Sequence, residues 1–338
     1  MSLWLVHLGR HGEWESLSLE KGLAVIGWQA LPNLSSLKTK EELYELLKKT
    51  YPENGAKTLQ AWLSILWYFS KEMKPGDLIA SPLKSRSAIA LGEVAGDYEY
   101  QPDLPEKHVR PVKWIKELPR DAFESDLLFS FGALGTVCRI QRNNAEERVR
   151  ALLAGKPAPK PQPEKPTPGE SGEWEAPPDL EQYALDQIRG YISRKFKGHD
   201  LARLVGAVLE SQGYKVQTSP EGPDGGVDII AGHGPMGFDD PRIVVQVKSG
   251  DSPVDVKVIR ELQGVMKNFG AKYGLMISWG GYRGSVPKEA SRLFFELRLW
   301  DADDLVRAIL ENYHNLPDDL QADLPLKRIW VLVNPEEE

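Results

Sequence analysis

The sequence contains a single cysteine, Cys138, in 338 residues. One cysteine excludes an intramolecular disulfide and any zinc site built from several thiolates. Cys138 stands in an apolar stretch that reads as helical, so we expect it to be a small buried residue. No apolar run approaches the roughly 18 residues of a membrane-spanning helix. The N-terminus also lacks the basic flank and cleavage site of a secretory signal. We therefore expect a soluble, cytoplasmic protein that does not contact a membrane.

The sequence also lacks an excess of basic charge. Its formal net charge is −7. Residues 1–155 carry equal numbers of basic and acidic side chains, and residues 181–338 carry an acidic excess. Neither half is a polycation that would coat nucleic acid without selectivity. Any nucleic-acid binding must therefore rely on local patches and on specific contacts.

Proline is unevenly distributed along the chain. Eight prolines fall between Pro157 and Pro178, mixed with lysine, glutamate and glycine. Such a stretch cannot bury a hydrophobic core, and it predicts an extended linker. The chain is long enough for two domains that each have a core. We therefore predict a first domain over 1–142, a helix end and linker over 143–180, and a second domain over 181–338.

Residues 213–250 hold the most informative pattern of the second domain. Glycine- and proline-rich turns separate three short predicted strands, at residues 214–218, 227–231 and 242–248. In the third strand, the two-residue period places Gln246 and Lys248 on one face, with valines on the other. Asp228 stands in the strand before. It could supply a carboxylate across this glutamine and lysine.

The set of Asp228, Gln246 and Lys248 resembles the PD-(D/E)xK nuclease signature in its glutamine variant. The surrounding blocks GYKVQTSP, PDGGVDIIA and VVQVKSG are similar to the Mrr-like branch of restriction endonucleases. The similarity continues through VKVIRELQGVM, YGLMISWGGY and LWDADDLV, so it covers roughly residues 198–313. The resemblance implies a mixed sheet flanked by helices, and an enzyme that hydrolyses phosphodiester bonds of double-stranded DNA.

The resemblance also implies roles for the individual residues. Phosphodiester hydrolysis calls for a hard cation, which prefers oxygen ligands. The cation would be Mg²⁺, for which Mn²⁺ can substitute. Its ligands would be the Asp228 carboxylate, the Gln246 side-chain carbonyl and the Val247 backbone carbonyl. Lys248 would orient or deprotonate the attacking water and stabilise charge on the phosphate.

Two further residues are candidates for this site. Glutamine in place of the usual acid removes one negative charge, which Asp224 could restore, although Asp-Gly-Gly also commonly forms a turn. Gln263 on the following helix could reach the site, or it is simply a polar helix residue. The family often carries a glutamate on the helix before the sheet. Leu201 and Ala202 stand at that place here, so the number of metal ions is open.

Residues 1–140 read as one α/β domain. Residues 121–155, which overlap its end, read as one or two helices. The blocks IGWQALPNLS, MKPGDLIASP, ALGEVAGDYEY and HVRPVKWI resemble the PUA-like superfamily, especially EVE-like domains. This resemblance implies a small pseudo-barrel with helices, and a pocket for a modified base turned out of the duplex. The whole chain is thus expected to combine α/β and α+β architecture in two domains.

A flipped base needs aromatic faces for stacking and fixed polar groups for its edge. The candidates are Trp28, Trp14, His7 and Arg10. Trp28 follows a glycine at a strand end, where it lines a pocket or belongs to the core. A basic strand offers contacts to DNA phosphates through Lys107, His108, Arg110 and Lys113. A solvated face is the alternative for each of these four.

The two resemblances together imply a modification-dependent restriction endonuclease that acts on modified double-stranded DNA. One site cuts one strand, so we expect a homodimer or a dimer induced by DNA. One alternative is an anti-phage defence effector, in which the N-terminal domain senses a nucleotide or a protein and controls a non-specific DNase. A second alternative is a DNA-binding protein with an inactive nuclease fold.

Overall fold

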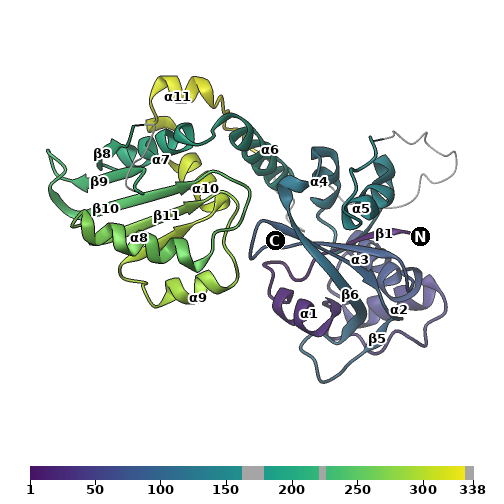
Figure 1. Cartoon of the computed structure of the whole chain (residues 1–338). Helices are drawn as coiled ribbons and strands as arrows, with labels where there is room; N and C mark the ends of the chain where they lie inside the picture. Colours follow the sequence, from purple (N-terminus) through teal and green to yellow (C-terminus); the bar gives the residue numbers. More distant parts are fainter. Residues whose placement is uncertain (162–178, 221–225, 332–338) are drawn as a thin grey trace. The chain divides into compact units, whose positions relative to one another are not determined.

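The computed structural model describes residues 1–161, 179–220 and 226–331 (Figure 1). The chain divides into two compact units, Met1–Asp186 and Gln187–Leu332. Within the described ranges, no helix combines the length and the apolar character needed to cross a bilayer.

The N-terminal unit is built around one curled sheet, whose strands follow the order β2-β6-β4-β3-β1-β7, with β5 paired to β6. The strands are β1 (Leu3–Val6), β2 (Leu23–Ile26), β3 (Leu78–Pro82), β4 (Ala88–Val94), β5 (Glu99–Tyr100), β6 (His108–Pro119) and β7 (Val137–Ile140). The helices are α1 (Glu15–Lys21), α2 (Lys40–Thr50), α3 (Ala56–Trp67), α4 (Ser125–Phe131) and α5 (Ala145–Leu153). Short helical turns add η1 (Tyr68–Glu72), η2 (Arg120–Ala122) and η3 (Arg142–Asn144).

In this sheet β1 and β3 are parallel, and the other described pairs are antiparallel. The predicted α/β domain with a barrel-like sheet is therefore confirmed. Its assignment to the PUA-like superfamily stays a prediction.

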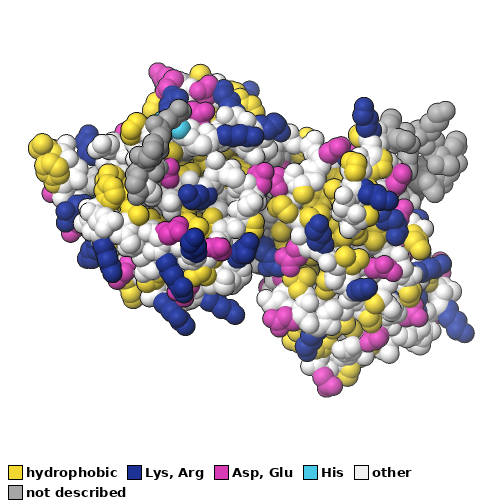
Figure 2. Space-filling view, viewed as in Figure 1, with side chains coloured by type: hydrophobic (Ala, Val, Ile, Leu, Met, Phe, Trp, Pro, Cys, Tyr) yellow, Lys and Arg dark blue, Asp and Glu magenta, His cyan; other side chains and the backbone are white. Residues whose placement is uncertain are grey.

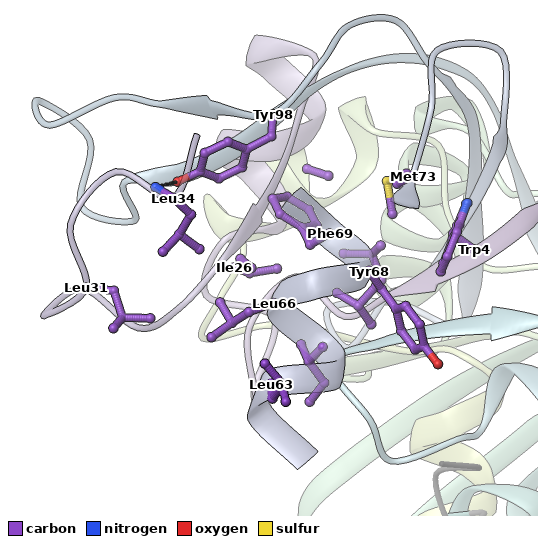
Figure 3. Packing of buried hydrophobic residues seen from close by; sticks show 14 of the residues in the cluster. Trp4, Ile26, Leu31, Leu34, Leu63, Leu66, Tyr68, Phe69, Met73 and Tyr98 are labelled. Carbon is purple, nitrogen blue, oxygen red and sulfur yellow. Dashed lines mark hydrogen bonds between the residues drawn. The ribbon is translucent and has the colours of Figure 1, made fainter. Parts of the chain in front are cut away.

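Strand β1 shows that the sheet is buried on both faces. Trp4 and Val6 pack into a cluster with residues of α2 and α3, whereas Leu3 and Leu5 pack into a cluster with residues of α4 and α5. Successive side chains of a strand point to opposite faces, which explains the all-apolar run of β1. Figure 3 shows the first cluster, where Trp4 and Tyr68 lie close together.

One part of the N-terminal prediction was incomplete. Residues 121–155 contain α4 and α5, but strand β7 lies between them and pairs antiparallel with β1. Cys138 is therefore on a strand rather than a helix, and it is half-buried. Burial raises the pKa of its thiol to about 12, so the thiolate is disfavoured at neutral pH.

The C-terminal unit is a five-stranded mixed sheet in the order β12-β11-β10-β9-β8. Its strands are β8 (Lys215–Thr218), β9 (Ile229–His233), β10 (Asp239–Lys248), β11 (Tyr273–Ser278) and β12 (Leu297–Trp300). The helices are α6 (Leu180–Lys195), α7 (His199–Ser211), α8 (Val256–Asn268), α9 (Ser285–Ser291), α10 (Ala302–Asn312) and α11 (Asp318–Asp323), with a short turn η4 (Tyr313–Asn315). Strands β10, β11 and β12 are parallel, and β8 and β9 are antiparallel to their neighbours.

Helices cover both faces of this sheet (Figure 1). Helices α8 and α9 contact one face, and α7 and α10 pack together on the other. Asp301 is the N-cap of α10 and forms a capping box with Asp304. Two-face coverage explains the nearly continuous apolar runs of β10 and β11. The predicted mixed sheet flanked by helices is confirmed.

The predicted linker lies only partly within the described residues. Helix α5 packs into the N-terminal unit through Ala145 and Val149. Residues 162–178, which hold most of the prolines, lie outside the described ranges. Helix α6 crosses the division between Asp186 and Gln187. The domain limits over 1–142, 143–180 and 181–338 stay predictions.

Candidate functional site

The predicted catalytic residues meet where β9 begins and β10 ends. Asp228 directly precedes β9, which runs antiparallel to β10. The Asp228 backbone N–H donates to the Val245 carbonyl over 3.0 Å, and its carboxylate Oδ2 accepts from the Val247 backbone N–H over 2.8 Å. These two bonds lie on either side of Gln246 in the sequence. They fix the carboxylate against the segment of β10 that carries Gln246 and Lys248.

The face on which Gln246 lies follows from its neighbour Val244. Val244 packs with Ile259 and Leu262 of α8. Gln246 and Lys248 follow it at the two-residue period of the strand, so they share the face that α8 covers. The predicted common face of these two polar residues agrees with this arrangement.

Gln246 is 8% exposed. Among the residues that the structure describes, its side-chain oxygen Oε1 has no hydrogen-bond partner. A buried carbonyl without a partner is costly, and in a native protein it points to a water, an ion or another ligand at that place. Together with the Asp228 carboxylate, this carbonyl offers the oxygen ligands that a hard cation prefers. The residues present therefore fit Mg²⁺ or Mn²⁺.

The end of β10 is held from two sides. The Trp279 backbone N–H donates to the Lys248 carbonyl over 2.8 Å, which ties the ends of the parallel strands β10 and β11 together. Gly280 lies so close to Asp251 that a Cβ there would stand 2.5 Å from the Asp251 carbonyl carbon. On the other side, the Gly198 backbone N–H donates to the Ser249 hydroxyl over 2.9 Å. Lys248 therefore projects from a fixed backbone.

Helix α7 carries no acid at positions 201 and 202, where the family resemblance predicts a glutamate. Leu201 and Ala202 are buried in the core, and Asp200 is exposed. Within residues 1–161, 179–220 and 226–331, no three His, Cys, Asp or Glu side chains form a group suited to a metal ion. Asp224 lies outside the described residues. Its role as a ligand or as a turn residue stays a prediction.

Gln263 is half-buried on α8. It lies one turn from Ile259 and Met266, whose side chains are buried against the sheet. This places Gln263 toward the covered face that also carries Gln246. Its participation in the site stays a prediction.

In the N-terminal unit, Trp28 has an unusual backbone. Its φ is 69°, a left-handed conformation that is rare for a bulky residue. The half-buried indole contacts the Trp62 ring edge-on, with 5.8 Å between centroids. Trp28 is therefore partly a core residue, yet it keeps an exposed portion. Its predicted role in stacking on a base stays a prediction.

Two predicted phosphate contacts are corrected by the structure. Arg110 is 1% exposed, and its guanidinium donates to the carbonyls of Phe69 and Gly96. Phe69 lies in the π-helical turn η1, and Arg110 satisfies its carbonyl. His108 is fully buried between Tyr98 and the Trp28 carbonyl, and burial lowers its pKa. Neither side chain faces solvent, so neither contacts a phosphate.

The other candidates of this unit are dispersed. Lys113 is exposed, and Lys107 lies 3.4 Å from the Gln29 carbonyl. His7 contacts the Ala133 carbonyl after α4, so the structure does not bring it to Trp28. Burial lowers the pKa of His7. Two further candidates lie on the segment after β1: Trp14 is half-buried at the start of α1, and Arg10 is exposed.

The sequence reasoning missed Glu106 and Ser249. Glu106 is a buried carboxylate that accepts from Gln29. It stands two residues before His108, just ahead of the strand that was selected for its basic residues. Ser249 directly follows Lys248, and its hydroxyl accepts from the backbone where α7 begins. The sequence signal that could have identified these two residues is that each lies within two positions of a candidate site residue, His108 or Lys248.

Each half of the chain matches a family model. Residues 193–309 match the family model Mrr_cat, described as a restriction endonuclease. Residues 4–131 match a model described as a domain of unknown function (DUF8426). A comparison with curated proteins finds no match.

Three solved structures are similar to this chain. The DNA modification-dependent restriction endonuclease AspBHI is 16% identical, with 96% of this chain and 84% of that chain covered and a TM-score of 0.32. The MspJI restriction endonuclease in complex with a 27-mer oligonucleotide is 12% identical, with 96% and 79% covered and a TM-score of 0.33. A protein of unknown function, AF1548, is 16% identical, with 34% and 65% covered and a TM-score of 0.25, so the match spans less than two thirds of its length.

Proposed function

We propose that this protein is a Mg²⁺-dependent DNA endonuclease whose N-terminal unit selects DNA by reading a flipped, modified base, since residues 193–309 match a restriction endonuclease family. The observation that carries the catalytic half is the junction of β9 and β10. There Asp228 is bonded to the backbone on either side of a buried glutamine whose side-chain oxygen has no partner among the described residues.

The residues of this junction have different roles in hydrolysis. Asp228, the Gln246 side-chain carbonyl and the Val247 carbonyl would hold the metal ion. When bound, Mg²⁺ supplies positive charge to the phosphate and lowers the pKa of the attacking water. Lys248 orients that water and stabilises the charge that develops on the phosphate oxygens. The water oxygen gives up a proton and forms a new bond to phosphorus, one ester P–O bond breaks, and the leaving oxygen takes up a proton.

The surface of the C-terminal unit supports contact with the DNA backbone. Figure 2 shows Lys and Arg side chains gathered over α8 and α9, the helices that cover the Gln246 face. Lys257, Arg260 and Arg292 have side-chain exposures of 83%, 68% and 82%, and each also lies within salt-bridge distance of Glu261 or Glu289, from which a phosphate would draw it. Such contacts position DNA without reading its sequence. Selectivity is therefore assigned to the N-terminal unit.

The test is cleavage of matched DNA duplexes, one unmodified and the others carrying modified cytosines, with Mg²⁺ and with EDTA. We expect Mg²⁺-dependent cleavage of a modified duplex and little cleavage of the unmodified one. Lys248→Ala is the control that links the activity to this site. Binding without any cleavage would instead favour an inactive nuclease fold. Equal cleavage of all duplexes would remove the reading of modified bases from the proposal.

We also propose that a double-strand break requires two copies of this chain, because one site cuts one strand. Sedimentation of the protein alone and with a cleavable duplex tests this. A homodimer or a dimer formed only on DNA is the expected result. A strictly monomeric complex that still makes double-strand breaks would contradict it.

A further inference from the structure

The start of β6 fixes Trp28 in its unusual conformation. The Trp28 carbonyl accepts from the Leu31 backbone N–H over 2.9 Å and pairs with His108 Nε2 at 3.2 Å. The other ring nitrogen of His108 lies 2.7 Å from the Tyr98 hydroxyl, which accepts from the Leu34 N–H, as Figure 3 shows. Burial lowers the pKa of His108, which favours a neutral ring with one donor and one acceptor.

This network has a consequence for the indole. Two donors hold the carbonyl of a bulky residue in the left-handed region, although an ordinary turn would place glycine there. Backbone strain of this kind persists where the surroundings enforce it, and it is concentrated at functional sites. The network thus holds the Trp28 ring against Trp62 while part of the ring stays exposed.

Glu106 is linked to the residue that follows Trp28, Gln29. The Gln29 side-chain amide donates to Glu106 Oε1 over 2.8 Å. Glu106 is 5% exposed, and its second oxygen, Oε2, has no hydrogen-bond partner among the described residues. Burial raises the pKa of Glu106, and the nearby charge of Glu13 adds to this.

A purely structural role explains Glu106 poorly. Among the described residues its hydrogen-bond partner is Gln29, an exposed side chain, so this bond fixes little of the fold. A buried carboxylate with an unsatisfied oxygen costs more free energy than one such bond returns. Glu15 provides a contrast in the same unit. It is equally buried, but it accepts from the Lys84 and Ser85 backbone and from the Ser85 hydroxyl.

We propose that Trp28, Gln29 and Glu106 form a base-reading site, and that it takes a nucleobase whose Watson–Crick edge carries an amino group. The planar base stacks on the exposed part of the indole. Its amino N–H donates to Glu106 Oε2, as a carboxylate accepts from cytosine N4. The exposed Gln29 amide moves aside or bonds the adjacent ring nitrogen. Uracil and thymine present a carbonyl at the amino position, and the carboxylate repels it.

This inference rests on the proposed reading of modified DNA and names the chemistry of that site. Two substrates carry the same ring substituent and differ at the edge at issue: 5-hydroxymethylcytosine paired with guanine and 5-hydroxymethyluracil paired with adenine. They differ in the amino or carbonyl group at C4, together with the proton on N3 and the paired base, which the comparison of variants controls for. Binding of the full chain to the two duplexes, in EDTA to prevent cleavage, isolates recognition of that group.

We expect wild-type protein to favour the cytosine duplex by about tenfold or more, the discrimination that a good base contact provides. Glu106→Gln should remove this preference, because an amide can donate to the uracil carbonyl. Glu99→Gln is the matched control: it makes the same change on an exposed carboxylate of β5, and it should keep the preference. Thermal unfolding of all variants establishes that they fold.

The outcomes separate this inference from the function on which it rests. If modified DNA is preferred over unmodified DNA and Glu106→Gln keeps the cytosine preference, the inference is overturned and the proposed function stands. If no modified duplex is preferred, the proposed reading of DNA fails. The free nucleotide 5-hydroxymethyldeoxycytidine monophosphate is then decisive. Its binding, lost in Glu106→Gln, would assign the same chemistry to a nucleotide sensor, and no binding would overturn the inference as well.

Discussion

The Asp228 carboxylate accepts a hydrogen bond from the Val247 backbone N–H over 2.8 Å, so it is fixed to the strand that carries Gln246 and Lys248. This bond ties together residues that stand far apart in the sequence. It also explains why the acid directly precedes β9, where the antiparallel partner β10 is within reach of a short side chain.

Asp228→Asn should lower the cleavage rate by about 10²-fold or more, the scale of losing one preorganised electrostatic group. The amide oxygen of asparagine can still accept from the Val247 N–H, so the fold is expected to persist. Cleavage kinetics at saturating Mg²⁺ and thermal unfolding measure the two effects. Activity within a few-fold of wild type would remove Asp228 from the site.

Lys248→Ala should abolish cleavage, with a loss of roughly 10²–10⁴-fold, while DNA binding and the melting temperature stay close to wild type. The lysine acts on water and phosphate, and the backbone around it is held by Trp279 and by the loop at Gly280. Lys215→Ala, on the exposed edge strand β8, is the matched control and should cleave normally. Equal losses in both variants would indicate a general effect of charge.

Gln246→Glu should reduce the Mg²⁺ concentration for half-maximal cleavage by about tenfold, equivalent to about 1.4 kcal/mol. A carboxylate attracts a cation more strongly than the neutral carbonyl that now lies buried without a partner among the described residues. A Mg²⁺ titration of the cleavage rate measures this. An unchanged midpoint would mean that Gln246 does not contact the ion.

The catalytic strand could be predicted because its information is local. The alternation of Val244, Gln246 and Lys248 defines a face, and an apolar run bounded by turns defines the strand. Arg110 and His108 were predicted wrongly because a basic residue on a strand favours an exposed position. Whether it is buried depends on a distant carbonyl, here that of Phe69.

Long-range contacts also explain what was missed. The sequence shows a Gly-Trp-Gln stretch, but the left-handed backbone of Trp28 arises from its bonds to Leu31 and His108. Glu106 has no local pattern that marks it as buried. Strand β7 was missed because a four-residue strand is too short for its periodicity to stand out between two helices.

Arg148→Met should destabilise the N-terminal unit by about 1–3 kcal/mol, because the charge-assisted hydrogen bonds of a buried guanidinium are lost while its carboxylate partners still reach solvent. The Arg148 side chain is fully buried and donates to Asp126 and Glu124. Thermal unfolding measures the loss. Glu146→Gln, which changes an exposed pair with Arg150 on the same helix α5, is the control and should cost little.

The same ion pair predicts a pH dependence of stability. The hydrogen bond from Arg148 holds the pKa of Asp126 below its usual value. A carboxyl whose pKa is lowered by folding stabilises the protein above the unfolded pKa of about 4, and this contribution is lost as the pH falls through the folded pKa. Wild type should therefore lose stability below about pH 4 more steeply than Arg148→Met. Parallel losses in the two proteins would contradict the assignment to this pair.

Trp28→Ala should weaken binding of the preferred modified duplex by roughly 5- to 150-fold, because stacking on one aromatic ring contributes about 1–3 kcal/mol. Binding of unmodified DNA should hardly change, because phosphate contacts do not depend on the base.

Alanine at this position keeps the strain of the left-handed backbone, so Trp28→Gly is the second variant. Glycine adopts φ near 69° without that strain. If both variants lose only the modified duplex, the indole ring reads the base. If affinity falls equally on both DNAs and the melting temperature falls in both variants, Trp28 is a core residue that packs against Trp62, and the base is read elsewhere.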